Sequence, residues 1–141
     1  MLSTSLLLLL IAATGLLCSA AGSGGARARP QRVALVIGLR PEKIARYREL
    51  HADPWPGVLA RISACHIRNY SIHLAELEPG RHYLFAYFEY CGADLEADMA
   101  AMAADEETVR WWRETDPCQQ PVATAGPAEK WKPMEELFFH P

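Results

Sequence analysis

The segment His82–Tyr90, with the sequence HYLFAYFEY, decides the fold because it carries apolar side chains on both of its faces. Successive side chains of a β-strand point to opposite sides of the sheet. One face of this segment therefore carries Tyr83, Phe85 and Tyr87, and the other carries Leu84, Ala86 and Phe88. We predict a strand that is buried or partnered on both sides.

The residues before this segment predict its partner strand. Ile67–Leu74, IRNYSIHL, alternates along its length and places Tyr70, Ile72 and Leu74 on one face. The sequence Glu78-Pro79-Gly80 between the two segments is typical of a turn. We therefore expect the two strands to form a hairpin.

The other elements follow from the same kind of pattern. Arg32–Leu39, RVALVIGL, is short, apolar and rich in β-branched residues, which predicts a buried strand. Pro41–His51 predicts a helix with Ile44, Tyr47 and His51 on one side. The remaining predicted elements are helices at Pro56–Ala64, Leu95–Ala104 and Glu106–Glu114, a loop at Asp116–Pro127 and a closing strand at Glu135–His140.

In chain order these elements form a β-α-β-β-α-β sequence with each helix broken into two pieces. This order predicts an α+β, ferredoxin-like fold of the dimeric α/β barrel type, in which helices cover one face of a four-stranded antiparallel sheet. The uncovered face would then present a larger apolar patch than a soluble monomer usually exposes. Pairing two copies sheet against sheet would cover that patch, so we predict a homodimer.

The first thirty residues differ from the rest of the chain. Met1–Ala21 has no charged side chain, and small residues follow its apolar run. This pattern is typical of a secretory signal, and the run is short for a membrane span. We expect a signal peptide at residues 1–22, a disordered linker at residues 23–31, one domain at residues 32–141, and no stable membrane insertion once the leader is removed. An uncleaved anchor and a misassigned initiation codon are the alternatives.

The composition excludes other classes of protein. The formal net charge is −3 and the sequence shows no cluster of Lys and Arg, so we expect no binding to nucleic acid. Without the leader the chain keeps Cys65, Cys91 and Cys118, an odd set that argues against a disulfide scaffold. It has no C-x-x-C motif and no pair of histidines at ligand spacing, so we expect no metal site and buried free thiols.

Two groups of residues are candidates for chemistry. Tyr47 and His51 are four positions apart on a predicted helix, so they share a face, and imidazole is the usual proton-transfer group near neutral pH. Trp111 and Trp112 point about 100° apart on their helix and would form an angled wall of the kind on which a sugar ring rests. Asn69-Tyr70 adds an amide and a phenol. Taken alone, these side chains could equally serve the core or a dimer contact.

In order and spacing, these segments resemble the L-rhamnose mutarotase family. The resemblance spans nearly all of Arg32–Pro141 and is carried by YRELH at 47–51, Trp55-Pro56, NYSI at 69–72, LFA at 84–86, Trp111-Trp112, Thr115-Asp116 and ELFFHP at 136–141. It implies an isomerase, a homodimer without a cofactor, that interconverts the α and β anomers of L-rhamnose or a related 6-deoxyhexose by general acid/base ring opening. It also implies that His51 is the catalytic acid and that Tyr47, Tyr70, Trp111 and Trp112 bind the monosaccharide.

Two features depart from that family. Its members are generally cytoplasmic, whereas the leader of this chain predicts export to the periplasm or out of the cell if it is functional. His73 stands where the family has an aromatic residue, and the turn at Glu78–Arg81 is lengthened, so the accepted sugar could differ. A cofactor-free or haem-using monooxygenase on the same fold and a non-catalytic sugar-binding module are the competing functions.

Overall fold

The computed structural model describes residues 29–141. The predicted signal peptide and most of the predicted linker lie outside the described residues. Strand β1, Gln31–Leu39, is the first element of the described residues and takes in the last residue of that linker. Within residues 29–141, no helix combines the length and the apolar character needed to cross a membrane.

An antiparallel sheet forms one layer of the molecule. Its main path runs β2-β3-β1-β4, with β2 at Ile67–Glu78, β3 at Arg81–Tyr90 and β4 at Gln119–Gln120. A short fifth strand, β5 at Lys132–Pro133, also pairs with β1. The predicted hairpin is confirmed, since β2 and β3 pair across the turn at Pro79-Gly80. The strand order is the one expected for a ferredoxin-like fold, which confirms the fold class.

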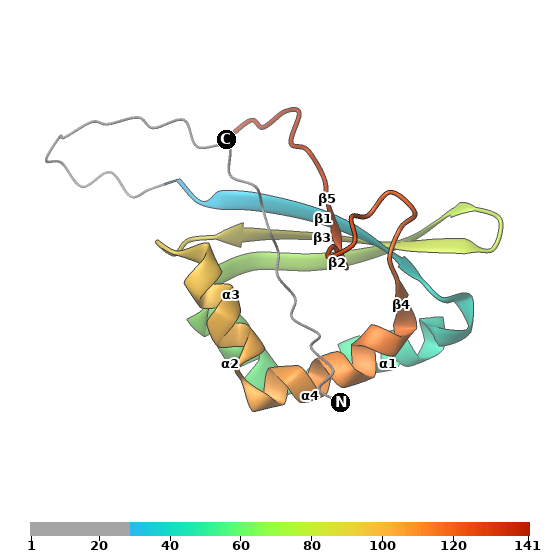
Figure 1. Ribbon diagram of the computed structural model, residues 1–141, viewed down its shortest axis with the longest axis horizontal. Helices are drawn as coiled ribbons and strands as arrows, with labels where there is room; N and C mark the ends of the chain where they lie inside the picture. The colour runs from blue at the N-terminus through green and yellow to red at the C-terminus, as the bar shows by residue number, and fades with distance from the viewer. Residues whose placement is uncertain (1–28) are drawn as a thin grey trace, which may run out of the picture.

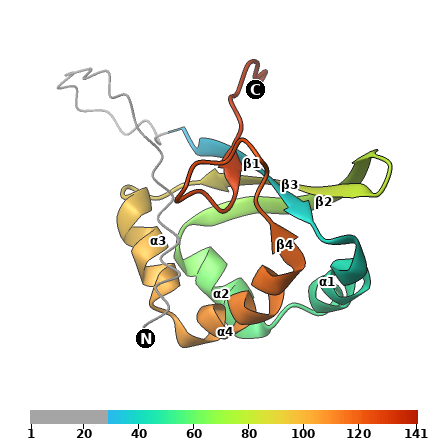
Figure 2. The same ribbon diagram turned by 45° about the vertical axis from the view of Figure 1, so that its right-hand side comes forward.

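Four α-helices form the second layer, and all lie on the same side of the sheet (Figures 1 and 2). They are α1 at Ile44–Ala52, α2 at Pro56–Ala64, α3 at Leu95–Ala103 and α4 at Glu106–Thr115. A short 3-10 helix, η1 at Pro41–Lys43, precedes α1. Another, η2 at Asp116–Cys118, follows α4. Each helical crossover is therefore in two pieces, as predicted.

Local signals set the helix starts. Pro56 occupies the first turn of α2, where its missing N–H costs nothing. The side chains of Asp94 and Asp105 cap α3 and α4, accepting hydrogen bonds from the backbone N–H groups of Ala97 and Thr108. These caps fix where α4 begins and therefore which way its tryptophans point.

The two faces of β3 have the burial that its sequence predicts. Leu84, Ala86 and Phe88 are buried under the helices. Tyr83, Phe85 and Tyr87 face the other way and are half-buried. The core therefore lies between the helices and one face of the sheet, and no helix of residues 29–141 covers the other face (Figure 1).

The predicted closing strand at Glu135–His140 is wrong. Those residues form no strand, and the sheet is closed instead by the two-residue β4, inside the predicted loop, and by β5. β4 pairs with β1 at Gly38–Leu39, and β5 pairs with it at Leu35–Val36. The apolar tail therefore cannot pair with β1 along those residues. Pro121 ends β4 because it has no N–H to donate.

The cysteines fit the prediction only in part. Cys65, Cys91 and Cys118 are all free, but only Cys65 and Cys118 are buried. Cys91 directly follows β3 and is exposed, so the prediction of a buried thiol is wrong there.

Gly38 allows β4 to approach β1. A Cβ atom at this position would lie 2.7 Å from the backbone carbonyl oxygen of Gln120, closer than real Cβ contacts. Because the obstacle is backbone, it cannot rotate away.

We expect Gly38→Ala to lower the free energy of unfolding by about 1–3 kcal/mol, the usual cost of overpacking. The matched control is Gly126→Ala, where the nearest atoms lie 3.4 Å away on the side chain of Glu129. That control should change stability by less than about 0.5 kcal/mol. Urea denaturation measures both, and equal stabilities for the two variants would contradict the role of Gly38.

Candidate functional site

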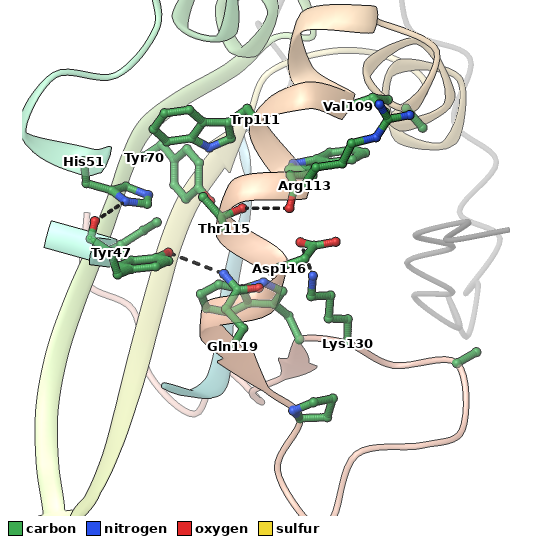
Figure 3. A pocket seen from close by; sticks show the side chains of 16 residues that line it. Tyr47, His51, Tyr70, Val109, Trp111, Arg113, Thr115, Asp116, Gln119 and Lys130 are labelled. Atoms are coloured by element: carbon green, nitrogen blue, oxygen red, sulfur yellow. Dashed lines mark hydrogen bonds and ion pairs between the residues drawn. The ribbon is translucent and has the colours of Figure 1, made fainter. Parts of the chain in front are cut away.

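A pocket of about 760 Å³ lies on the helix-covered side of the sheet (Figure 3). Its walls come from α1, β2, α4, β4 and the segment between β4 and β5. All five residues predicted for the site line it: Tyr47, His51, Tyr70, Trp111 and Trp112. The fold thus brings together side chains that are far apart in the sequence.

His51 is held in a defined orientation. Its Nδ1 atom lies 2.9 Å from the carbonyl oxygen of Tyr47, one turn earlier in α1. Its ring stacks on the Tyr47 ring, with centroids 4.1 Å apart, and meets the edge of Trp111 at 5.3 Å. Two aromatic contacts and one hydrogen bond leave the imidazole little freedom to turn.

This hydrogen bond determines which ring nitrogen carries the proton. A carbonyl oxygen only accepts, so Nδ1 must donate, and the neutral ring then has its lone pair on Nε2. Burial lowers the pKa of His51 below its ordinary value of 6.5, and the bond to the Tyr47 carbonyl only partly opposes this shift. At neutral pH His51 is therefore an uncharged base with Nε2 available to a ligand.

Tyr47 is buried, and burial raises the pKa of its phenol well above the ordinary value of 10. The phenol thus stays protonated at physiological pH. Its oxygen lies 3.5 Å from the amide nitrogen of Gln119 (Figure 3). Tyr47 therefore supports His51 with its ring and reaches the pocket with a neutral hydroxyl.

A β-bulge directs Tyr70 into the pocket. Asn69 and Tyr70 of β2 together lie opposite one residue of β3, Phe88, and Asn69 has a left-handed φ of 50°. Asparagine tolerates this conformation better than most residues. The extra residue turns Tyr70 to the helix side, as bulges commonly re-aim side chains. The Tyr70 ring meets Phe88 edge-on at 5.7 Å.

Tyr70 is partly open to solvent and partly sheltered. Its side chain is 44% exposed. Even so, burial raises the pKa of its phenol to about 12, so the hydroxyl stays protonated. A protonated phenol at the pocket mouth is suited to donate a hydrogen bond to a sugar oxygen.

The two tryptophans form adjoining walls from α4. Trp111 is buried and packs edge-on against both His51 and Trp55, with the Trp55 centroid 5.4 Å away. Trp112 is half-buried and packs against two core clusters. Both indoles also line the pocket, so the same side chains contribute to the core and to the pocket wall.

Sequence analysis missed several lining residues. Gln119 is 8% exposed and lines the pocket from β4, but nothing around it in the sequence marks it as a site residue. Asp116 and Lys130 form an ion pair at the pocket, and Trp131 and Arg113 also line it. Lys130 and Trp131 lie in the segment between β4 and β5, after the predicted loop at Asp116–Pro127, where the sequence pattern predicted no element.

The departures noted in the sequence lie elsewhere. His73 is exposed on β2, bonds to Ser71 at 3.3 Å and does not line the pocket. None of Glu78–Arg81 lines it either. The hypothesis that these residues alter the choice of sugar therefore finds no support in the geometry.

In chemical terms, the pocket combines one neutral imidazole, two protonated phenols, one buried amide and an aromatic wall. Aromatic faces bind the C–H surfaces of sugars while hydroxyl, amide and indole N–H groups bind their oxygens. Across residues 29–141, no three His, Cys, Asp or Glu side chains gather as metal ligands would.

Comparison with known proteins gives a consistent result. The chain is 32% identical over 109 residues to the L-rhamnose mutarotase of Bacillus subtilis, covering 77% of this chain and 97% of that protein. It is 27% identical over 118 residues to the L-rhamnose mutarotase of Mesorhizobium japonicum, covering 77% and 96%.

The fold matches a solved structure as well. The crystal structure of the L-rhamnose mutarotase from Formosa agariphila superimposes with a TM-score of 0.58, at 22% identity, over 79% of this chain and 99% of that one. The model of the L-rhamnose mutarotase family matches residues 32–140, which is most of the chain. This chain therefore belongs to the L-rhamnose mutarotase family.

Proposed function

We propose that this protein is a mutarotase that interconverts the α and β anomers of L-rhamnose or a related 6-deoxyhexose. The observation that carries the proposal is the orientation of His51. Its Nδ1 donates a hydrogen bond to the Tyr47 carbonyl, so Nε2 is the nitrogen that can carry a proton to and from a ligand in the aromatic-walled pocket. Both family relatives and the structural match carry the name L-rhamnose mutarotase.

The reaction moves one proton between two oxygens of the sugar. Nε2 of His51 takes the proton of the anomeric hydroxyl, and the C1–O5 bond breaks as the C1–O1 bond becomes a carbonyl. The imidazolium then returns the proton from Nε2 to O5, which yields the open aldehyde and neutral histidine. After rotation about C1–C2 the same steps run in reverse on the other face of the aldehyde.

His51 thus acts first as a base and then as the acid that family resemblance implies. Its lowered pKa suits this sequence, because a weakly basic imidazole gives the proton back readily. The protonated phenols of Tyr47 and Tyr70 are placed to donate hydrogen bonds to sugar oxygens, including O5 while it carries negative charge.

The demand on the catalyst is modest. Mutarotation proceeds without an enzyme, and general acid–base catalysis supplies roughly 10²–10⁴-fold. Holding the sugar on the Trp111 and Trp112 wall adds the benefit of positioning. One histidine and a shaped pocket are therefore sufficient for this reaction.

We expect His51→Ala to reduce kcat for anomer exchange by roughly 10²–10⁴-fold, since it removes the proton carrier. The measurement is polarimetry on freshly dissolved α-L-rhamnose at low buffer concentration. His73→Ala is the matched control, because His73 lies outside the pocket and should leave the rate unchanged. Equal rates for His51→Ala and the unmodified protein would refute the catalytic role of His51.

The pH dependence follows from the direction of the His51 shift. Burial lowers its pKa in the folded protein below 6.5, so the neutral base persists to lower pH than in an exposed histidine. We expect kcat/KM to be level from pH 8 to 7 and to fall only below about pH 6.5, approaching tenfold per pH unit.

The same shift makes acidification destabilising, because below pH 6.5 the unfolded chain binds the His51 proton more strongly than the folded chain does. Circular dichroism at each pH shows whether the protein is still folded, and so distinguishes unfolding from protonation of His51. A fall in kcat/KM that begins above pH 7, while the protein is still folded, would contradict the assignment of His51 as the base.

We also propose that the protein is a homodimer that pairs through the helix-free face of the sheet. Phe85, Tyr87 and Val36 lie on that face. The C-terminal tail crosses to the same face, where Glu136 accepts two hydrogen bonds of 2.6 Å from Arg32. Beyond this anchor, Leu137 is 86% exposed and Phe138 is 82% exposed. A second copy would cover both the sheet face and these side chains.

We expect light scattering on the mature protein to give twice the mass of one chain. Phe85→Lys places a charge in the proposed interface and should give a folded monomer. Leu59→Lys is the control, since Leu59 is exposed on helix α2, away from that face, and should leave a dimer. A monodisperse monomer of the unmodified protein at micromolar concentration would refute the dimer.

A further inference from the structure

Gln119 combines deep burial with an incomplete set of hydrogen bonds. Its side-chain nitrogen lies 3.5 Å from the Tyr47 hydroxyl, which is the far limit of a hydrogen bond. Its side-chain oxygen is fully buried and has no partner among the described residues. Buried polar groups are almost always satisfied, so an unpartnered amide oxygen on a residue that lines a pocket points to a ligand that completes its hydrogen bonds.

The backbone holds this amide in place. Gln119 pairs with Leu39 and Gln120 pairs with Gly38, where the absence of a Cβ allows the close approach of the strands. The N–H of Arg40 donates to the carbonyl of Cys118 at 2.9 Å, which ties the residue before Gln119 to the end of β1. The backbone of β4 is therefore fixed at this place, and Gln119 lines the pocket from it.

Either orientation of the amide leaves one end free. A glutamine side chain has a donor end and an acceptor end, and the Tyr47 hydroxyl can bond to either of them. The other end then lies buried without a partner, on a residue that lines the pocket. A sugar hydroxyl both donates and accepts, so it satisfies this free end in either case.

Gln119 and His51 meet different parts of Tyr47. The imidazole stacks on the face of the Tyr47 ring, whereas the amide approaches its hydroxyl (Figure 3). A pyranose whose anomeric carbon lies at His51 would therefore present a different carbon to Gln119.

We propose that Gln119 is a specificity-determining residue that hydrogen-bonds one hydroxyl group of the bound sugar, away from the anomeric carbon. The inference rests on the proposed function, because it assigns a further contact within the same pocket. Sugars that lack this hydroxyl leave the amide unpartnered in the complex, so they lose binding in the bound ground state and in the transition state.

The test compares unmodified protein with Gln119→Leu on L-rhamnose and on its 2-deoxy, 3-deoxy and 4-deoxy analogues. We expect Gln119→Leu to lower kcat/KM for L-rhamnose by 10- to 100-fold. With the one analogue that lacks the contacted hydroxyl, the two proteins should agree within twofold. The thermal midpoint of Gln119→Leu should equal or exceed that of the unmodified protein, since a buried unpartnered carbonyl is removed.

Gln120→Leu is the matched control, because Gln120 is the exposed neighbour in β4 and does not line the pocket. It should change neither the rates nor the ranking of the four sugars. An equal loss on all four sugars, or no loss on any of them, would overturn the inference. A lower thermal midpoint together with an equal loss would assign Gln119 a structural role instead.

Fluorescence of the pocket tryptophans separates failure of this inference from failure of the proposed function. The contact is supported if Gln119→Leu weakens the binding only of sugars that carry the contacted hydroxyl. This holds even if the unmodified protein does not accelerate anomer exchange. Weakened binding without acceleration would reject the proposed mutarotase function and support the hydrogen bond between Gln119 and the sugar. Acceleration by the unmodified protein with unaltered sugar selectivity in Gln119→Leu would reject the contact alone.

Discussion

The hydrogen bond between His51 Nδ1 and the carbonyl of Tyr47 is the interaction on which the site depends. It joins residues one turn apart in α1, so the helix itself brings the two partners within reach. The bond assigns the proton to Nδ1, and stacking on Tyr47 and edge contact with Trp111 prevent the ring from flipping. The other lining side chains enclose the pocket, whereas this bond gives it an oriented base.

The one-sided fold explains how the other walls reach that base. The four helices of the described residues lie on one side of the sheet, α1 and α4 among them (Figure 1), and His51 of α1 meets Trp111 of α4. The bulge in β2 adds Tyr70 and the short strand β4 adds Gln119. The other face of the sheet is left without a helix, so the architecture that forms the pocket also supplies the surface for the proposed dimer.

The main elements and the five predicted lining residues followed from periodicity and family resemblance. The structure of long periodic segments such as His82–Tyr90 can be predicted well, because alternate residues of a strand lie on opposite faces and their types show which face is apolar. The closing strand was misplaced because apolar residues at Leu137–Phe139 resemble a strand, whereas the pairing depends on which edge of β1 is free. Gln119 was missed for a related reason, since its burial depends on tertiary contacts and not on its neighbours.

The site depends on a His51 that is neutral at physiological pH, with its proton on Nδ1 and its lone pair on Nε2. Nitrogen-15 NMR of labelled histidine side chains reports the protonation of each ring nitrogen. At pH 7 we expect a protonated Nδ1 and an unprotonated Nε2 for His51, with the Nε2 resonance shifting when L-rhamnose is added. A proton on Nε2, a fully protonated ring at pH 7, or no response of Nε2 to sugar would contradict it.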